Sequence, residues 1–367
     1  MELLYIAFIV VILGLLALDL FVLHRKAHVV SVREALRWSA FWIGLGLAFT
    51  VFVYIGYERH WLGLGTSVDT TAVPFVGADG VTYYNDGQTA AVKYLTGFVV
   101  EKSLAVDNIF VIAMIFSFLG VPAMYQHRVL FWGIIGALLM RGIMIGVGAA
   151  LITKFTWIIY VFGGFLILTG VKMLLIKEQA TDFEKNFLVR TVRRLFPVTE
   201  RYHGEKFFVR AGSPESLAPP TPGAPPETDR VVARAARGAL LATPLFLALV
   251  LVEFTDVIFA VDSIPAIFAI TTDAFIVFTS NVFAILGLRS LYFALAGMFD
   301  RFKYLKVALS IVLVVIGVKM MTHGWLKEWL GPHFNFYVLG LVATIIAAGV
   351  ISSLVATRAS AVRTTPP

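Results

Sequence analysis

The sequence contains no cysteine and few charged residues. None of its 367 residues is a cysteine, and only 14% are Asp, Glu, Lys or Arg. The absence of cysteine excludes disulfides, thiolate metal sites and thiol redox chemistry. Because a soluble domain has about 25% charged residues, the low charge content argues against a soluble protein. The sequence also has no phosphate-binding glycine loop, HExxH pair or nucleophile elbow, so we expect no enzyme.

Apolar residues make up 59% of the chain, and its mean hydropathy is +0.86. Apolar segments of about twenty residues predict membrane-spanning helices. We therefore expect an all-α polytopic membrane protein with about nine transmembrane helices. Their approximate bounds are 3–23, 38–57, 94–119, 128–151, 155–176, 242–270, 274–297, 304–323 and 334–356. The first segment lacks the basic start of a secretory signal peptide, and we expect it to be retained.

The net charge of +7 is distributed unevenly among the loops. Twenty-one of the thirty basic residues fall in the regions that a nine-helix topology places on one side, and four fall on the other. Basic loops mark the cytoplasmic side, so the N-terminus is predicted outside and the C-terminus in the cytoplasm. The charge is thereby explained by anionic lipid, and no nucleic-acid partner is expected.

The predicted segments divide the chain into six parts. These are an N-terminal two-helix segment (1–57), an external loop (58–93), a first three-helix unit (94–176), a basic, proline-rich cytoplasmic loop (177–241), a second three-helix unit (242–323) and a C-terminal helix with its tail (324–367). Within the external loop, Gly and Asn-Asp pairs predict turns or a short hairpin. Residues 211–229 predict a linker. Pro244 predicts a helix start and Pro265 a kink.

Two motifs place carboxylates inside apolar segments. Glu101 and Asp107 are six residues apart, as are Asp256 and Asp262, and a small polar residue, Asn108 or Ser263, follows each second acid. A buried charge at membrane depth is costly and marks a functional site by default. Residues six apart differ by about 120° around a helix. A local break, or an acid that pairs with a base, would bring both to one site.

Three matches in the same order indicate an internal repeat. Residues 105–108 match 260–263, the segment ending at Arg141 resembles the one ending at Arg289, and 170–173 match 317–320. Three helices per unit is an odd number, so the second unit must enter the membrane from the opposite side. The sequence thus predicts an inverted repeat, an architecture that places ion sites near the midplane.

The oxygen-rich side chains of these helices form a candidate metal site. Carboxylate, amide and hydroxyl oxygens suit Mn²⁺, Mg²⁺ or Ca²⁺, whereas softer ions prefer thiolate or histidine. The seven histidines all fall in loops or at helix ends. The candidate ligands are Glu101, Asp107, Asn108, Glu253, Asp256, Asp262 and Ser263, and the additional or pairing residues are Asp19, Thr255, Lys102, Arg141 and Arg289.

Structural ion pairing is the alternative for the same residues. The acids would then be neutralised by Arg141, Arg289 and the neighbouring lysines. Such a network is often replaceable by apolar residues, so its duplication favours an ion pathway. We predict that Asp107 lies opposite Asp262 and Glu101 opposite Asp256, and that both arginines pair with the acids when no cation is bound. Lys172 and Lys319 are expected to extend to the membrane interface.

The sequence resembles the TerC/Alx family, which is named for tellurium resistance and alkaline induction. The resemblance rests on Asp19–His28, Ser31–Ala35, Trp38-Ser39, Glu101–Asn108 and Glu253–Ser263. It implies an integral membrane protein similar to small inverted-repeat cation exporters, with a role in manganese efflux. The functional acids of the family map onto Glu101, Asp107, Glu253, Asp256 and Asp262. The proline-rich insertion and the longer external loop depart from the family pattern.

Together these observations predict a secondary transporter in the bacterial inner membrane. It would export Mn²⁺, or a similar hard divalent cation, in exchange for protons, with no cofactor. Membrane lipid is its other expected partner; a homo-oligomer and secreted metalloenzymes as indirect beneficiaries are compatible with this interpretation. One alternative is a membrane scaffold in a tellurite or envelope-stress complex. Export of the tellurite oxyanion is a weaker one, because an anion site should present arginines rather than five acids.

Overall fold

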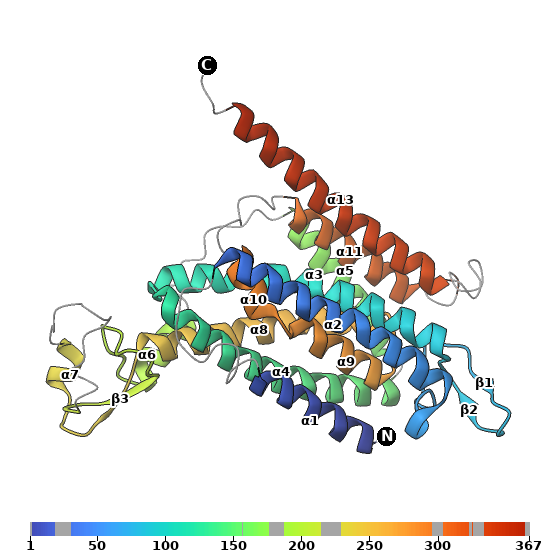
Figure 1. The fold of residues 1–367 in the computed structure, drawn as a ribbon, viewed down its shortest axis with the longest axis horizontal. Helices are drawn as coiled ribbons and strands as arrows, with labels where there is room; N and C mark the ends of the chain where they lie inside the picture. The colour runs from blue at the N-terminus through green and yellow to red at the C-terminus, as the bar shows by residue number, and fades with distance from the viewer. Residues whose placement is uncertain are drawn as a thin grey trace.

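The fold is a bundle of long helices with a small mixed region at one end (Figure 1). The computed structural model describes residues 2–18, 31–155, 157–175, 187–213, 229–295, 304–322, 325 and 334–363. The helices are α1 (Glu2–Leu18), α2 (Val32–Glu58), η2 (Trp61–Gly63), α3 (Gly87–Leu119), α4 (Ala123–Lys154), α5 (Ile158–Leu175), α6 (Phe187–Leu195), α7 (Arg230–Arg234), α8 (Pro244–Phe268), α9 (Ala274–Ile285), α10 (Leu288–Leu295), α11 (Leu305–Met321) and α13 (Phe334–Arg363). The strands are β1 (Phe75–Val76), β2 (Thr82–Tyr83), β3 (Phe208–Arg210) and β4 (Leu240–Ala242).

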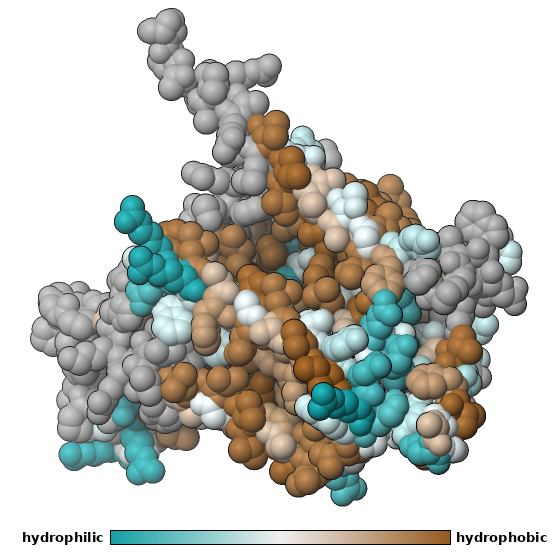
Figure 2. Space-filling model, turned by 45° about the vertical axis from the view of Figure 1, so that its right-hand side comes forward, coloured by the Kyte–Doolittle hydropathy of each residue, from teal (hydrophilic) through white to brown (hydrophobic). Residues whose placement is uncertain are grey.

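Each of the nine predicted segments overlaps a described helix, and the segment 274–297 overlaps two, which confirms the all-α polytopic class. Among the described residues, seven segments are long and apolar enough to cross a membrane: α2, α3, α4, α5, α8, α9 with α10, and α13. The other two, α1 and α11, each have 17 described residues. Large apolar side chains such as Leu139, Leu168 and Val51 are exposed on the helices. Figure 2 shows such side chains covering the middle of one face, as lipid contact requires.

The two ends of the bundle differ in structure. At the first, which we call the hairpin end, β1 pairs with β2 in the predicted short hairpin. At the second, the basic end, β3 pairs with β4 beside α6 and α7. Most of the proline-rich stretch 211–229 lies outside the described residues. Pro244 is the first residue of α8, as predicted, because proline lacks the N–H that a first helical turn leaves unbonded.

Two differences from the predicted segments bear on the site. α3 begins at Gly87, seven residues before the expected start, because the Asp86 side chain accepts a hydrogen bond from Thr89 N and caps the helix. The segment 274–297 is broken between α9 and α10. Gly287 has φ +78°, and a Cβ there would meet Cβ of Trp42 at 2.5 Å. Only glycine fits this left-handed, closely packed position, and the break follows from it.

The centre of the bundle is formed by α3, α4, α8 and α9. Ten of the twelve α9 residues are buried, so α9 is enclosed by its neighbours. α3 and α8 pack antiparallel (Figure 1), because a Cβ on Gly97, in the first third of α3, would lie 3.7 Å from Ile267 near the end of α8. Each of these two helices carries one of the two acidic motifs.

Contacts between α5 and α11 are those expected for an inverted repeat. The offset of 147 that aligns Gly170 with Gly317 also aligns Gly163 with Ser310. A Cβ on Gly317 would lie 2.8 Å from the Gly163 carbonyl oxygen, and a Cβ on Gly170 would lie 2.7 Å from the Ser310 carbonyl oxygen. If each residue of α5 is replaced by its counterpart in α11, and the reverse, the contact between Gly317 and Gly163 becomes the contact between Gly170 and Ser310. The close antiparallel pair supports the repeat, which stays a prediction for the units as a whole.

Candidate cation site

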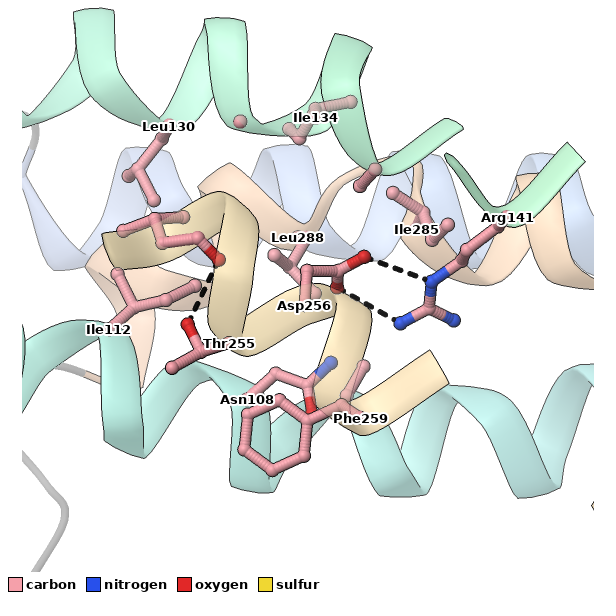
Figure 3. A pocket seen from close by; sticks show the side chains of 14 residues that line it. Asn108, Ile112, Leu130, Ile134, Arg141, Thr255, Asp256, Phe259, Ile285 and Leu288 are labelled. Atoms are coloured by element: carbon pink, nitrogen blue, oxygen red, sulfur yellow. Dashed lines mark hydrogen bonds and ion pairs between the residues drawn. The ribbon is translucent and has the colours of Figure 1, made fainter. Parts of the chain in front are cut away.

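Arg141 of α4 lies at the centre of the bundle and is 2% exposed. Its guanidinium binds Asp256 of α8 in a bidentate manner, with Nε donating to Oδ2 at 3.2 Å and Nη2 to Oδ1 at 3.0 Å (Figure 3). Nη1 pairs with Glu101 of α3 and donates to Asn281 Oδ1 of α9 at 3.0 Å. Ser263 Oγ lies at 3.5 Å from the same nitrogen. Three helices thus contribute oxygen groups to one cationic group of a fourth.

Charged side chains so deep in the bundle cost free energy, and they are retained mainly where they have a function. Glu101 and Asp256 lie near the middle of α3 and α8, where lipid surrounds the bundle. Two carboxylates here face one guanidinium, and Glu101 Oε2 is buried without a hydrogen-bond partner. A charge left incompletely paired in the interior is expensive. The cluster therefore marks a site that can accept more positive charge.

Arg141 gathers only part of the predicted site. It brings Glu101 and Asp256 together, as predicted, and it pairs with acids, as predicted. α3 runs as one helix through its motif, so pairing, not a local break, accounts for the position of Glu101. In the part of the chain that the structure describes, no three His, Asp or Glu side chains converge on a point where they could hold a metal ion. Glu101 and Asp256 are the two predicted acids that Arg141 brings together, and the role of the other acids as ligands stays a prediction.

Asn281 was missed by sequence reasoning. It lies in α9, which carries no acidic motif, and it is 1% exposed. Its Oδ1 accepts from Arg141, while its Nδ2 is buried without a partner. An amide in an otherwise apolar helix could have been singled out, since buried polar groups need partners.

A small pocket lies beside Asp256 and is lined mainly by apolar side chains from α3, α4 and α8. Asn108 and Thr255 also line it (Figure 3). The Thr255 hydroxyl donates within its own helix, to the Leu251 and Val252 carbonyl oxygens at 2.8 and 2.9 Å. Because the hydroxyl acts only as a donor in these bonds, the Thr255 oxygen keeps its lone pairs for a cation, as does the amide oxygen of Asn108.

Glu253 lies one turn before Asp256 on α8, and its side chain is half-buried. A Cβ placed on Gly136 of α4 would overlap the Glu253 carboxylate. The carboxylate therefore rests against bare backbone of α4. Glu253 and Arg141 both lie where α4 packs against α8, and Glu253 lies at the edge of the site.

The second acid of each motif lies six residues beyond the first. Asp262 accepts a 3.4 Å hydrogen bond from Thr169 Oγ1 of α5, and both Asp262 and Asp107 are half-buried. Because Gly97 of α3 lies beside Ile267 of the antiparallel α8, Asp107 lies near the level of Val257. Asp262 is five residues farther along α8, which is about 8 Å along the helix axis. That Asp107 and Asp262 face each other stays a prediction.

The remaining predicted bases have different roles. Lys102 donates to the Ala284 and Leu286 carbonyl oxygens at 2.9 and 3.1 Å, and so satisfies the end of α9 at its break. Lys319 was expected at the interface but is 3% exposed, and it donates to the Ala269 carbonyl oxygen at 2.9 Å. That correction follows from the tight packing of α11, which encloses the side chain. Lys172 is exposed, and Arg289 is buried just after the break. Asp19 lies outside the described residues.

A second buried polar cluster, at the hairpin end, was not predicted. Asp69 of the external loop is 1% exposed. It accepts from Lys93 Nζ of α3 at 2.9 Å, from Asn85 Nδ2 at 3.0 Å and from the backbone N of Thr272 at 3.1 Å. We call the contacts of Asp69 with Lys93, Thr271 and Thr272 the Asp69 latch. It fastens the external loop to the α8–α9 connection.

Electrostatics favour the ionised form of Asp69. Burial alone would raise its pKa, but the Lys93 charge and the hydrogen bonds from Thr271, Lys93 and Asn85 outweigh burial and hold the pKa well below its ordinary value. Asp273, which caps α9, behaves in the opposite way. Burial and the nearby Asp69 charge raise its pKa to about 6. The latch therefore holds a firmly ionised carboxylate, and next to it in the chain is Asp273, whose pKa is raised to about 6.

Comparisons with known proteins agree with this architecture. The model of the integral membrane protein TerC family matches residues 86–361. An uncharacterized membrane protein of Myxococcus xanthus is 44% identical over 355 residues, which cover 97% of this chain and 93% of the relative. Two relatives carry the name membrane-bound redox modulator Alx. The one from Photorhabdus laumondii is 40% identical over 95% of this chain and 93% of its own, and the one from Escherichia coli K12 is 43% identical over 87% and 85%. No solved structure matches. Because the family model spans most of the chain, the protein belongs to the TerC family of integral membrane proteins.

Proposed function

We propose that the protein exports Mn²⁺, or a similar hard divalent cation, across the bacterial inner membrane. The observation that carries this proposal is the position of Glu101 and Asp256. Two carboxylates from counterpart positions of two helical units meet at mid-membrane depth, with Asn281 and Ser263 beside them. Oxygen ligands of this kind suit Mn²⁺, Mg²⁺ and Ca²⁺. The cation in this proposal is a substrate that passes through the site.

The orientation proposed for the cycle follows from charge. The basic end faces the cytoplasm, where positively charged loops are retained, and the hairpin end faces outside. A cation enters from the basic end, is held by Glu101 and Asp256, and leaves when the Asp69 latch opens. Protons that bind the same carboxylates after release reset the transporter. The inverted repeat provides the alternation of access.

Reconstitution in liposomes tests the proposal. The purified protein should move Mn²⁺ along an imposed gradient, and Asp256→Asn should slow this flux at least about tenfold, because a lost charged ligand is worth about 1.5–3 kcal/mol. Asp79→Asn is the matched control, since Asp79 is an exposed aspartate of the hairpin, and its flux should equal that of the wild type. Replacing Mn²⁺ by Ca²⁺ or Mg²⁺ in the same assay ranks the three ions.

A scaffold without transport is the alternative function. Two relatives are named membrane-bound redox modulators. This chain has no cysteine, and so it has no thiol for disulfide exchange. A scaffold would move no Mn²⁺ under any gradient in the liposomes. Equal flux in the wild type, in Asp256→Asn and in empty liposomes would therefore contradict export and favour the scaffold.

A further inference from the structure

The guanidinium of Arg141 occupies the position that a hard cation would take. Its nitrogens contact a carboxylate of Asp256, a carboxylate of Glu101 and the amide oxygen of Asn281, with the Ser263 hydroxyl at 3.5 Å. All four groups are oxygen ligands, and they come from α3, α8 and α9. They surround one cation held on the side chain of a fourth helix, α4.

Charge decides whether Arg141 and a divalent cation can be present together. Without a cation, the two carboxylates and the guanidinium sum to a charge of −1. A divalent cation added beside Arg141 would bring the sum to +1, whereas a divalent cation that replaces Arg141 brings it to zero. Neutral clusters are favoured in the low-dielectric interior. The loaded site therefore favours a guanidinium that has moved away.

Two buried atoms indicate that the site is incomplete with Arg141 alone. Glu101 is 1% exposed, and its Oε2 has no hydrogen-bond partner. Asn281 is equally buried, and its Nδ2 has none either. A network built only for stability would be expected to satisfy its buried polar atoms. A free carboxylate oxygen beside the guanidinium is instead a ligand that a second, smaller cation could use.

We propose that Arg141 is a tethered competitor of the transported divalent cation, and that Asn281 supplies an oxygen ligand once Arg141 has moved. This inference rests on the proposed function. Arg141 keeps Glu101 and Asp256 together in the empty transporter, and its return after release expels the cation from the same oxygens. Binding by Arg141 and by the cation are mutually exclusive.

Equilibrium binding of Mn²⁺ to the purified full-length protein tests the inference. Arg141→Met removes the competitor while keeping most of the side-chain volume. It should bind Mn²⁺ at least about tenfold more tightly than the wild type, since a competing charge has been removed, and it should transport more slowly because nothing expels the ion. Arg128→Met is the matched control. Arg128 also lies in α4 and pairs with an acid, Glu205, but both side chains are about one-third exposed, and the affinity should not change.

Two further variants probe the same competition. Arg141→Lys keeps the charge but lacks the fork that holds two carboxylates, so its Mn²⁺ affinity should lie between those of the wild type and Arg141→Met. Asn281→Leu should weaken Mn²⁺ binding in both the wild-type and the Arg141→Met background. In Arg141→Ala, a few millimolar free guanidinium ion should compete with Mn²⁺, and it should have no such effect on the wild type.

Each outcome has a defined meaning. If the wild type and every variant bind no Mn²⁺, the proposed function fails. If the wild type binds Mn²⁺ and Asp256→Asn does not, but Arg141→Met and Arg141→Lys bind no more tightly than the wild type, the competition fails and the proposed function stands. If none of the three Arg141 variants folds, Arg141 has a structural role, and the inference is overturned.

Discussion

Glu253 owes its position to a residue that has no side chain. Its carboxylate rests against Gly136 of α4, one turn from the Asp256 contact with Arg141. Any side chain at position 136 would occupy the space of that carboxylate. Gly136 therefore leaves room for Glu253 beside the cation site. Substitution of Gly136 can move the Glu253 carboxylate without changing Glu253 itself.

Gly136→Ala should displace Glu253 with little loss of stability. The added methyl meets only the flexible end of a glutamate, so the free energy of unfolding should change by less than about 1 kcal/mol, within the range in which alanine favours a helix over glycine. Mn²⁺ binding should weaken if Glu253 is a ligand. Gly146→Ala is the control on the same helix, because a Cβ there has no neighbour within 4 Å.

Unfolding and Mn²⁺ titration of both variants check this prediction. Wild-type Mn²⁺ affinity in Gly136→Ala would exclude Glu253 from the binding site. A loss of affinity of the same size in Gly146→Ala would show that the effect comes from helix stiffness, and it would contradict the steric explanation as well.

Individual acids could be predicted from the sequence, whereas their partners could not. Glu101, Asp256 and Arg141 stand out because charge in an apolar segment is rare. Asn281 could be singled out as an amide in an apolar helix, but only the packing of α9 against α4 identifies its partner. Asp69 lies in a polar loop that gives no sign of burial. The opposition of Asp107 and Asp262 was predicted from the repeat alone, and it stays a prediction because it depends on the axial register of α3 against α8.

At the scale of elements, the break between α9 and α10 positions two basic side chains. Lys102 binds the carbonyl groups that the end of α9 leaves free, and Arg289 follows the break directly. Gly287 makes the break, with its positive φ and its close approach to Trp42 of α2. α2 therefore packs against the break, and the hydrophobic segment 274–297 is not one straight helix.

Gly287→Ala should destabilise the protein by about 2–5 kcal/mol. A left-handed conformation costs alanine about 1–2 kcal/mol, and overlap with a packed neighbour adds about 1–3 kcal/mol. Gly80→Ala separates the two effects, because Gly80 has the same positive φ, +80°, with no neighbour within 4 Å of its Cβ. Gly80→Ala should therefore lose only the stability that the left-handed conformation costs.

The midpoint of thermal unfolding in detergent compares the two variants. Equal midpoints for Gly287→Ala and Gly80→Ala would show that contact with Trp42 contributes nothing, and that backbone conformation alone accounts for the break.

At the scale of the whole molecule, the Asp69 latch connects parts of the chain about two hundred residues apart. The Thr70 N donates to Thr272 Oγ1 at 2.9 Å, and the two threonine hydroxyls lie 3.4 Å apart. Opening of the hairpin end requires these contacts to separate. Because the chain has no cysteine, a new pair of cysteines can be crosslinked without competing thiols.

A Thr70→Cys and Thr272→Cys double variant should therefore lock the hairpin end. The hydroxyl separation brings the two sulfurs within reach of a disulfide after a small side-chain adjustment. Mn²⁺ flux in liposomes should be lost when the crosslink forms and should return on reduction, because alternating access needs the latch to open. Each single cysteine variant serves as the control. Full flux in the crosslinked protein would show that the cation does not leave by this end.

The sequence by itself determined the class, the spanning segments and the acids at membrane depth. These are local properties, since lipid requires about twenty apolar residues per helix and penalises each buried charge. Tertiary structure decided which groups meet: Arg141 with Glu101, Asp256 and Asn281, and Asp69 with Lys93 and Thr272. Such pairings depend on the register of one helix against another and on where glycine allows close approach. No periodicity along a single segment records that register, and for this reason the partners of the acids became visible only in the folded chain.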